Sequence, residues 1–133
     1  MNLLIVDDDD ICNFINNRVA LTSRIFSNVS AVHNGQDALR YLEDALNGVA
    51  HMPDVILLDL NMPLLNGFEF IRALRSLSLP HVRNIHIIIL TSSEDPNDVH
   101  QATLMGVDHY LLKPLTVNQL RETIFSLHKR SAA

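Results

Sequence analysis

The chain has 133 residues, the length of one ordinary domain, and 47% of them are hydrophobic. Its formal net charge of −5 argues against a nucleic-acid surface, which needs a basic stripe. A single cysteine excludes an internal disulfide, and no apolar run reaches the roughly 20 residues of a membrane helix. Met1 leads directly into an apolar run without a basic leader, so we expect a cytoplasmic protein. From its charge and its short apolar runs, we expect that it binds neither nucleic acid nor membranes.

The first part of the chain predicts two strands, each followed by a helix. Residues 3–6 are continuous in Leu, Ile and Val, which is typical of a strand buried on both faces of a parallel sheet. The weaker run at residues 28–32 fits an edge strand. Helical spacing predicts that the following apolar side chains form the buried faces of the two helices: Ile11, Phe14, Ile15 and Val19, then Ala38, Leu39, Leu42, Ala45 and Leu46.

The rest of the chain continues the alternation. Buried strands are predicted at residues 55–60 and 85–90, and a weaker one at 109–113. One helix is expected to open at Pro96, a favourable first helical position, and another at Thr116, which forms a capping-box pattern with the glutamine three residues on. The apolar positions at helical spacing are Phe68, Ile71 and Leu74, then Val99 and Ala102, then Leu120, Ile124 and Leu127.

Strand and helix therefore alternate five times, which predicts an α/β fold. We expect a flavodoxin-like (βα)5 arrangement: a doubly wound, parallel, five-stranded sheet in the order 2-1-3-4-5, with right-handed crossovers and helices on both faces. The domain should span residues 1–128, and residues 129–133 should form a loose tail.

Acidic residues follow two strands that this order makes neighbours. Asp7 and Asp8 come directly after the first strand, and Asp59 lies near the end of the third. Ligands bind beyond the carboxyl ends of the strands in such sheets, so these acids should meet there, with Thr91 and Lys113 at the ends of the fourth and fifth strands. Adjacent carboxylates need a counter-charge, and Mg²⁺ bound through oxygen atoms answers that need and invites a phosphoryl group.

Four motifs at these strand ends resemble a known family. They are "VDD" at residues 6–8, "LLDLNMPLLNG" at 57–67, "LTSS" at 90–93 and "LLKP" at 111–114. Together, and in this order, they resemble the receiver domain of bacterial two-component response regulators, over about residues 3–128. The resemblance implies a stand-alone, single-domain regulator, which is a signalling switch and not an enzyme, although it assists its own phosphorylation and dephosphorylation.

The resemblance also implies roles for the acids. Asp59 would be the phosphoacceptor, which takes a phosphoryl group from the phosphohistidine of a sensor histidine kinase or a histidine phosphotransfer protein. Asp8 would bind Mg²⁺ directly, together with Asp59 and the backbone carbonyl of Asn61, and Asp7 would contribute through water.

Four further residues receive roles from the resemblance. Lys113 would pair with the carboxylate and then with the phosphoryl group, and Thr91 would donate its hydroxyl to a phosphoryl oxygen. Tyr110 would be the aromatic switch that turns inward when Thr91 moves, and Pro114 would follow a cis peptide bond. Residues 96–128 would form the face that binds an unknown downstream protein or a second copy of the chain.

Simpler interpretations hold for other polar residues. Asp9 is expected to cap the first helix, and Asp10 to favour its dipole. Ser93 is a small residue that leaves access for an attacking water. Cys12 is interpreted as a buried small residue, and Gly67 as part of a turn. The histidines lack the spacing of a zinc site; they are His33, His51, His81, His86, His100, His109 and His128.

Three alternative functions compete with the switch. An FMN carrier on the same topology needs phosphate-binding backbone donors after the first strand, where this chain has four aspartates. An aspartate-nucleophile phosphatase would separate its two acids by one residue and carry a cap insertion, whereas these acids are contiguous. A phosphate-shuttle protein, which passes the group on to a histidine protein, fits the sequence as well as the switch does.

Overall fold

A computed structural model describes residues 1–77, 82 and 84–132. All ladders of its five-stranded sheet are parallel, and the strand order is β2-β1-β3-β4-β5, which confirms the predicted fold class. The centre of the sheet is built from aliphatic runs that bury every side chain of β3. The strands are β1 Asn2–Val6, β2 Asn28–Val32, β3 Val55–Leu58, β4 His86–Thr91 and β5 His109–Leu112.

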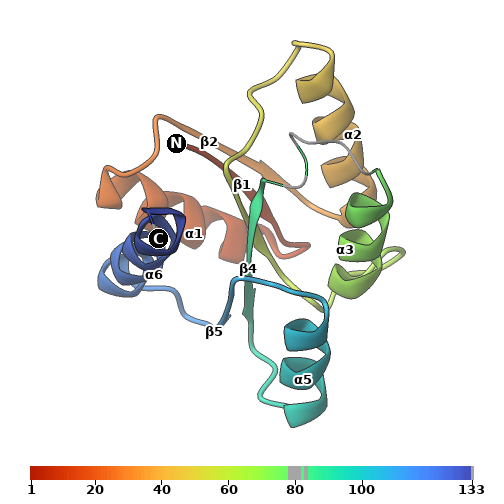
Figure 1. The fold of residues 1–133 in the computed structure, drawn as a ribbon, viewed down its shortest axis with the longest axis vertical. Helices are drawn as coiled ribbons and strands as arrows, with labels where there is room; N and C mark the ends of the chain where they lie inside the picture. The colour runs from red at the N-terminus through yellow and green to blue at the C-terminus, as the bar shows by residue number, and fades with distance from the viewer. Residues whose placement is uncertain (78–81, 83, 133) are drawn as a thin grey trace.

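Helices cover both faces of this sheet (Figure 1). α1 and α6 lie on one face, and α2, α3 and α5 lie on the other. None of the helices in the described part of the chain combines the length and the apolar character that a membrane span requires. The helices are α1 Asp10–Ser23, α2 Gly35–Leu46, α3 Gly67–Ser76, α5 Pro96–Leu104 and α6 Val117–Ala132.

The core is divided by the sheet into two hydrophobic clusters. Alternate strand residues point to opposite faces, so Leu4 and Ile56 join the cluster under α2 and α3, whereas Leu3 and Leu57 join the cluster under α1 and α6. Phe70, which is fully buried, is one of the largest side chains of the first cluster. These two clusters hold the strands in one register and so fix the ends of the strands relative to one another.

The buried face of α1 differs from the predicted one. Ile11 is 70% exposed and Phe14 is 65% exposed, and Ile15 also lies on the surface. The buried face instead carries Asn13, Asn16, Ala20 and Ser23. Polar side chains occupy this face because they hydrogen-bond to buried carbonyl groups: the Asn13 amide donates to the Asp7 carbonyl (2.8 Å), and the Ser23 hydroxyl donates to the Ala20 carbonyl (2.6 Å). An apolar surface therefore remains exposed on α1, next to the acidic segment.

The carboxyl-terminal helix is longer than predicted. The expected cap at Thr116 is present, since its hydroxyl oxygen accepts the Gln119 backbone N–H at 3.1 Å. The helix then continues to Ala132, so the boundary predicted after residue 128 falls within α6, and residues 129–132 continue the helix and do not form a loose tail. The predicted helix start at Pro96 is confirmed, and Gly106 follows α5 with a φ of 74°, a left-handed conformation that glycine adopts without strain.

Candidate functional site

The sheet register brings four strand ends to one place. Val6 pairs with Leu58, so Asp7 and Asp59 follow neighbouring strands at the same level. The backbone N–H of Asp59 donates to the Val6 carbonyl at 3.0 Å, which extends the ladder to the acidic residue itself. On the other side of β4, the Lys113 backbone N–H donates to the Thr91 carbonyl at 2.9 Å. The residues predicted for the site are therefore fixed by backbone pairing.

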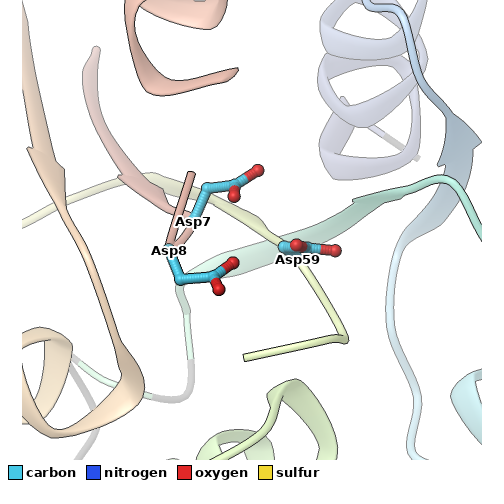
Figure 2. A group of neighbouring side chains, drawn as sticks. All are labelled: Asp7, Asp8 and Asp59. Carbon is cyan, nitrogen blue, oxygen red and sulfur yellow. The ribbon is translucent and has the colours of Figure 1, made fainter. Parts of the chain in front are cut away.

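Three carboxylates meet at this edge (Figure 2). One oxygen atom from each of Asp7, Asp8 and Asp59 lies within 4.8 Å of the other two. Asp7 is 2% exposed and Asp59 is 6% exposed, whereas Asp8 is open to solvent. Asp7 and Asp59 are thus buried, and Asp8 lies between them and the solvent.

Lys113 is the cation that faces these acids. Its Nζ lies 2.7 Å from Asp7 Oδ2 and 3.5 Å from Asp59 Oδ2, so the two buried carboxylates share one ammonium group. Partial burial alone would lower the pKa of Lys113, but the hydrogen bond to Asp7 and the charges of Asp59 and Asp7 raise it well above its usual value. Lys113 therefore stays protonated at any physiological pH.

The charge of the Asp59 carboxylate is incompletely compensated. Burial raises its pKa above the ordinary value, and the neighbouring charge of Asp7 raises it further. Lys113, the backbone N–H of Asn61 and the Thr91 hydroxyl oppose this effect but do not cancel it. The Asn61 N–H is a weak donor because it lies 3.5 Å from Asp59 Oδ1. The site therefore has an unmet demand for positive charge at Asp59.

A hard divalent cation fits this arrangement. The candidate ligands are all carboxylate oxygens, which Mg²⁺ and Mn²⁺ prefer over nitrogen or sulfur. Asp7 already accepts hydrogen bonds from the Asp9 N–H and from Lys113, whereas no hydrogen bond from the described residues engages the Asp8 carboxylate. Asp8 and Asp59 are thus the acids with the most free coordinating capacity. The three acids could together hold a metal ion.

The first residue of α3, Gly67, packs closely against the backbone of Asp59 and Leu60. A Cβ atom on Gly67 would lie 2.7 Å from the Asp59 carbonyl oxygen and 2.9 Å from the Cα of Leu60. Only glycine allows the helix to begin this close to the backbone of Asp59 and Leu60, and the Gly67 N–H donates to the Leu60 carbonyl at 3.1 Å. The glycine predicted to serve a turn therefore also sets the position of Asp59.

Thr91 and Tyr110 lie on the side of the site toward α5. Thr91 is fully buried, and its Oγ1 accepts the backbone N–H of Ser93 at 3.3 Å. The half-buried Tyr110 donates its hydroxyl to the Ser93 carbonyl at 2.9 Å. Burial raises the pKa of Tyr110, and the side chain of Ser93 opposes this shift. The two predicted switch residues, Thr91 and Tyr110, are therefore each hydrogen-bonded to the backbone of Ser93.

Some features of the site were not predicted from the sequence. Cys12 is half-buried and not fully buried as expected, and its Sγ lies 3.5 Å from Lys113 Nζ. Asn13, to which the sequence assigned no role, donates its amide to the Asp7 carbonyl and lies 3.2 Å from His33 Nδ1. The signal for Asn13 is its place one turn beyond Asp9, which caps α1 through Ile11 and Cys12.

The remaining predicted residues are placed as follows. The bond between Lys113 and Pro114 is cis. Asn61 is exposed beside Asp59, and Asp10 begins α1. The metal-binding group found among the described residues contains no histidine, and the described histidines are exposed or half-buried. His81 lies outside the described residues.

Comparison with known families agrees with this geometry. Residues 3–125 match the family described as the response regulator receiver domain. The chain is 33% identical over 130 residues to the probable transcriptional regulator ycf27 of Cyanidium caldarium. The matched region covers 97% of this chain and 47% of that protein. The chain spans about half the length of several of the curated relatives that it matches, although it covers 12% of one and 65% of another. The chain belongs to the response regulator receiver family, whose members act as signalling switches in two-component systems.

Solved structures show the same relationship. A two-component response regulator from Cytophaga hutchinsonii has a TM-score of 0.85 and 32% sequence identity, with 96% of each chain covered. The Mn²⁺-bound form of response regulator Rcp1 has a TM-score of 0.75 and 25% identity, with 92% of this chain and 88% of that chain covered. A divalent metal is therefore bound by a protein of the same fold and family.

Proposed function

We propose that this chain is a Mg²⁺-dependent phosphoacceptor, which takes a phosphoryl group onto Asp59 from a phosphohistidine. The observation that carries the proposal is the meeting of Asp7, Asp8 and Asp59 within 4.8 Å, with a single lysine shared between the two buried acids. An excess of negative charge that one ammonium group does not neutralise is suited to a divalent cation and a transferring phosphoryl group.

The reaction moves one phosphoryl group between two nucleophiles. A carboxylate oxygen of Asp59 forms a bond to phosphorus, and the phosphorus–nitrogen bond to the donor imidazole breaks. The electron pair of that bond returns to the imidazole nitrogen, which is protonated from solvent. The product is an aspartyl phosphate, and the balance of atoms needs no further reactant.

The residues of the chain bind and orient the reacting groups. Asp8, Asp59, the Asn61 carbonyl and, through water, Asp7 would hold Mg²⁺, which supplies positive charge to the phosphoryl oxygens. The raised pKa of Asp59 makes its carboxylate more basic than an exposed one and so a better nucleophile. Lys113 stays protonated and can turn from the carboxylates to a phosphoryl oxygen, and the Thr91 hydroxyl can donate to another.

Phosphorylation would then shift the equilibrium between two conformations of the chain. Thr91 would be drawn toward the phosphoryl group, Tyr110 would settle inward, and residues 96–128 would change their surface. The proposed donor is a sensor histidine kinase or a histidine phosphotransfer protein in the cytoplasm. The proposed recipients of the signal are a downstream protein or a second copy bound through residues 96–128, and the phosphate-shuttle alternative shares the same acceptor chemistry.

The test is phosphoryl uptake from acetyl phosphate, measured by intact mass with and without Mg²⁺. The wild-type chain should gain the mass of one phosphoryl group only when Mg²⁺ is present. Asp59→Asn should gain none, because an amide oxygen is a poor nucleophile. Asp54→Asn is the matched control, since it makes the same change at the other edge of the sheet and should be labelled normally. Equal labelling of Asp59→Asn and wild type would refute the assignment.

A further inference from the structure

Ser93 lies in the turn between β4 and α5, where its backbone and its side chain both form hydrogen bonds. Its N–H donates to Thr91 Oγ1 at 3.3 Å, and its carbonyl accepts from the Tyr110 hydroxyl at 2.9 Å. Its own hydroxyl donates to Asp98 Oδ2 at 2.6 Å and accepts from the Asp95 N–H at 3.3 Å. One residue therefore contacts the end of β4, the aromatic residue of β5 and the first turn of α5.

α5 depends on such polar contacts because little apolar surface anchors it. Only Ala102 of its nine residues is buried. At its far end, Arg75 Nη2 donates to the Gly106 carbonyl at 3.3 Å. At its near end, the bond from Ser93 to Asp98 is shorter, and an ionised acceptor makes such bonds stronger than neutral ones. A helix with one buried side chain follows the residues that hold its ends.

We propose that the Ser93 hydroxyl couples phosphorylation of Asp59 to the position of α5, an inference that rests on the proposed function. When the Thr91 hydroxyl turns toward a phosphoryl oxygen, it no longer holds the Ser93 N–H, and the turn is free to shift. The bond to Asp98 makes the first turn of α5 shift with it. Tyr110, bonded to the carbonyl of the same residue, moves in the same step. Ser93 is a positioning residue, because it acts on α5 through Asp98.

The test compares phosphoryl uptake with the response of α5. Uptake is measured by intact mass after acetyl phosphate and Mg²⁺. The response is measured as the change in backbone amide NMR shifts of residues 96–104 when Mg²⁺ and beryllofluoride, a stable mimic of the phosphoryl group, are added. Ser93→Ala removes the hydroxyl, Ser93→Thr restores it, and Ser92→Ala makes the same deletion at an exposed neighbour.

Ser93→Ala should still be labelled, whereas its α5 shift changes should fall by at least roughly twofold. Ser93→Thr and Ser92→Ala should respond like the wild type. Asp98→Ala should lose as much of the response as Ser93→Ala, and the double variant should lose no more than either single one, because both changes remove the same bond. A merely structural role for Ser93 would leave the beryllofluoride-induced change at its wild-type size.

The outcomes separate this inference from the proposed function. A full α5 response in a labelled Ser93→Ala variant overturns the coupling and leaves the acceptor role standing. Failure of the wild-type chain to be labelled overturns the acceptor role itself. If Ser93→Ala loses the helical shifts of α5 before beryllofluoride is added, Asp98→Leu replaces it, since this variant keeps a side chain of similar size but has no acceptor for the Ser93 hydroxyl. A weakened response in Asp98→Leu supports the coupling, and a full response overturns it.

Discussion

Acidic residues lie at both ends of the parallel strands but serve different purposes there. The end at which the strands begin is the amino edge of the sheet, and the end at which they stop is the carboxyl edge. At the amino edge, Asp54 accepts the Asn2 backbone N–H at 2.7 Å, and Asp108 accepts the Ile87 N–H at 2.8 Å. At the carboxyl edge, Asp7 and Asp59 face each other and share Lys113. Each amino-edge acid is satisfied by a neighbouring strand, whereas the carboxyl-edge acids keep an excess of negative charge.

The difference follows from the polarity of parallel strands. Strands begin with free backbone N–H groups, which can donate to a carboxylate, and they end with carbonyl groups, which cannot. An acid placed before a strand therefore joins two strands, as Asp108 joins β4 and β5. An acid placed after a strand finds no N–H group of a neighbouring strand, and it depends on the N–H groups of its own turn, as Asp7 does with Asp9, and on a side-chain donor or a cation. The comparison predicts that substitutions at the carboxyl edge change function most and those at the amino edge change stability only.

The largest effect is expected from the proposed metal site. Asp8→Asn removes the carboxylate with the most free coordinating capacity, and it should slow Mg²⁺-dependent labelling by acetyl phosphate roughly 100-fold, the order of a lost electrostatic contact to a transferring group. EDTA should slow wild-type labelling at least as much. Intact mass over time measures both rates. Normal labelling of Asp8→Asn at low Mg²⁺ would remove Asp8 from the site.

The second effect concerns the shared cation. Lys113→Ala should retain Mg²⁺ binding, because the three acids remain, but it should uncouple phosphorylation from the change around Tyr110. The chain has two tyrosines and no tryptophan, so 3-fluorotyrosine labelling gives two resonances, of which Tyr41 is the internal reference. On addition of beryllofluoride, the Tyr110 resonance should shift in the wild type and stay in place in Lys113→Ala. A wild-type shift in this variant would count against the role of Lys113.

A third effect is on stability and its dependence on pH. Because the folded chain raises the pKa of Asp59, the ionised carboxylate destabilises the fold once the pH exceeds its ordinary pKa. Asp59→Asn should therefore raise the free energy of unfolding at neutral pH in EDTA, and this gain should vanish as the pH falls through the raised pKa toward the ordinary value. Asp7→Asn should instead lower the free energy of unfolding at neutral pH, since it removes the carboxylate that lies 2.7 Å from Lys113 Nζ. Urea denaturation across pH measures both, and a destabilised Asp59→Asn in EDTA would contradict the account.

The smallest effect is expected at the amino edge. Asp108→Ala removes one side-chain acceptor of a backbone N–H and should lower the free energy of unfolding by about 1 kcal/mol. Its labelling by acetyl phosphate should match that of the wild type, because it lies at the opposite end of the strands. Urea denaturation and intact mass on the same sample check both halves, and slowed labelling would break the contrast between the edges.

The sequence predicted the sheet and the group of residues at its carboxyl edge because both depend on short, strong signals. Strands buried on both faces need continuous aliphatic runs, and the parallel order then determines which strand ends meet. Asp7, Asp59 and Thr91 follow such runs directly, and Lys113 ends the weaker fifth run, so their meeting needed no knowledge of side-chain packing. The caps at Asp9 and Thr116 were predictable for the same reason, since a cap acts on residues two or three positions away.

The sequence could not predict features that depend on packing between elements. Helical spacing marked Ile11 and Phe14 as buried on α1, but that face is turned outward because Asn13 is needed against the Asp7 carbonyl. A polar residue that serves a buried carbonyl outweighs the apolar pattern, and no local rule shows this. Likewise, nothing in "LTSS" shows that the hydroxyl of Ser93 is bonded to Asp98, because that contact depends on where α5 begins.

The most direct measurement is the location of the phosphoryl group on the chain. After treatment with acetyl phosphate and Mg²⁺, borohydride reduces an aspartyl phosphate to homoserine, and peptide mass spectrometry then locates the converted residue. The account predicts homoserine at position 59 and aspartate unchanged at positions 7 and 8. Homoserine at either of those positions, or unconverted aspartate at 59 in a chain that carries the added mass, would contradict it.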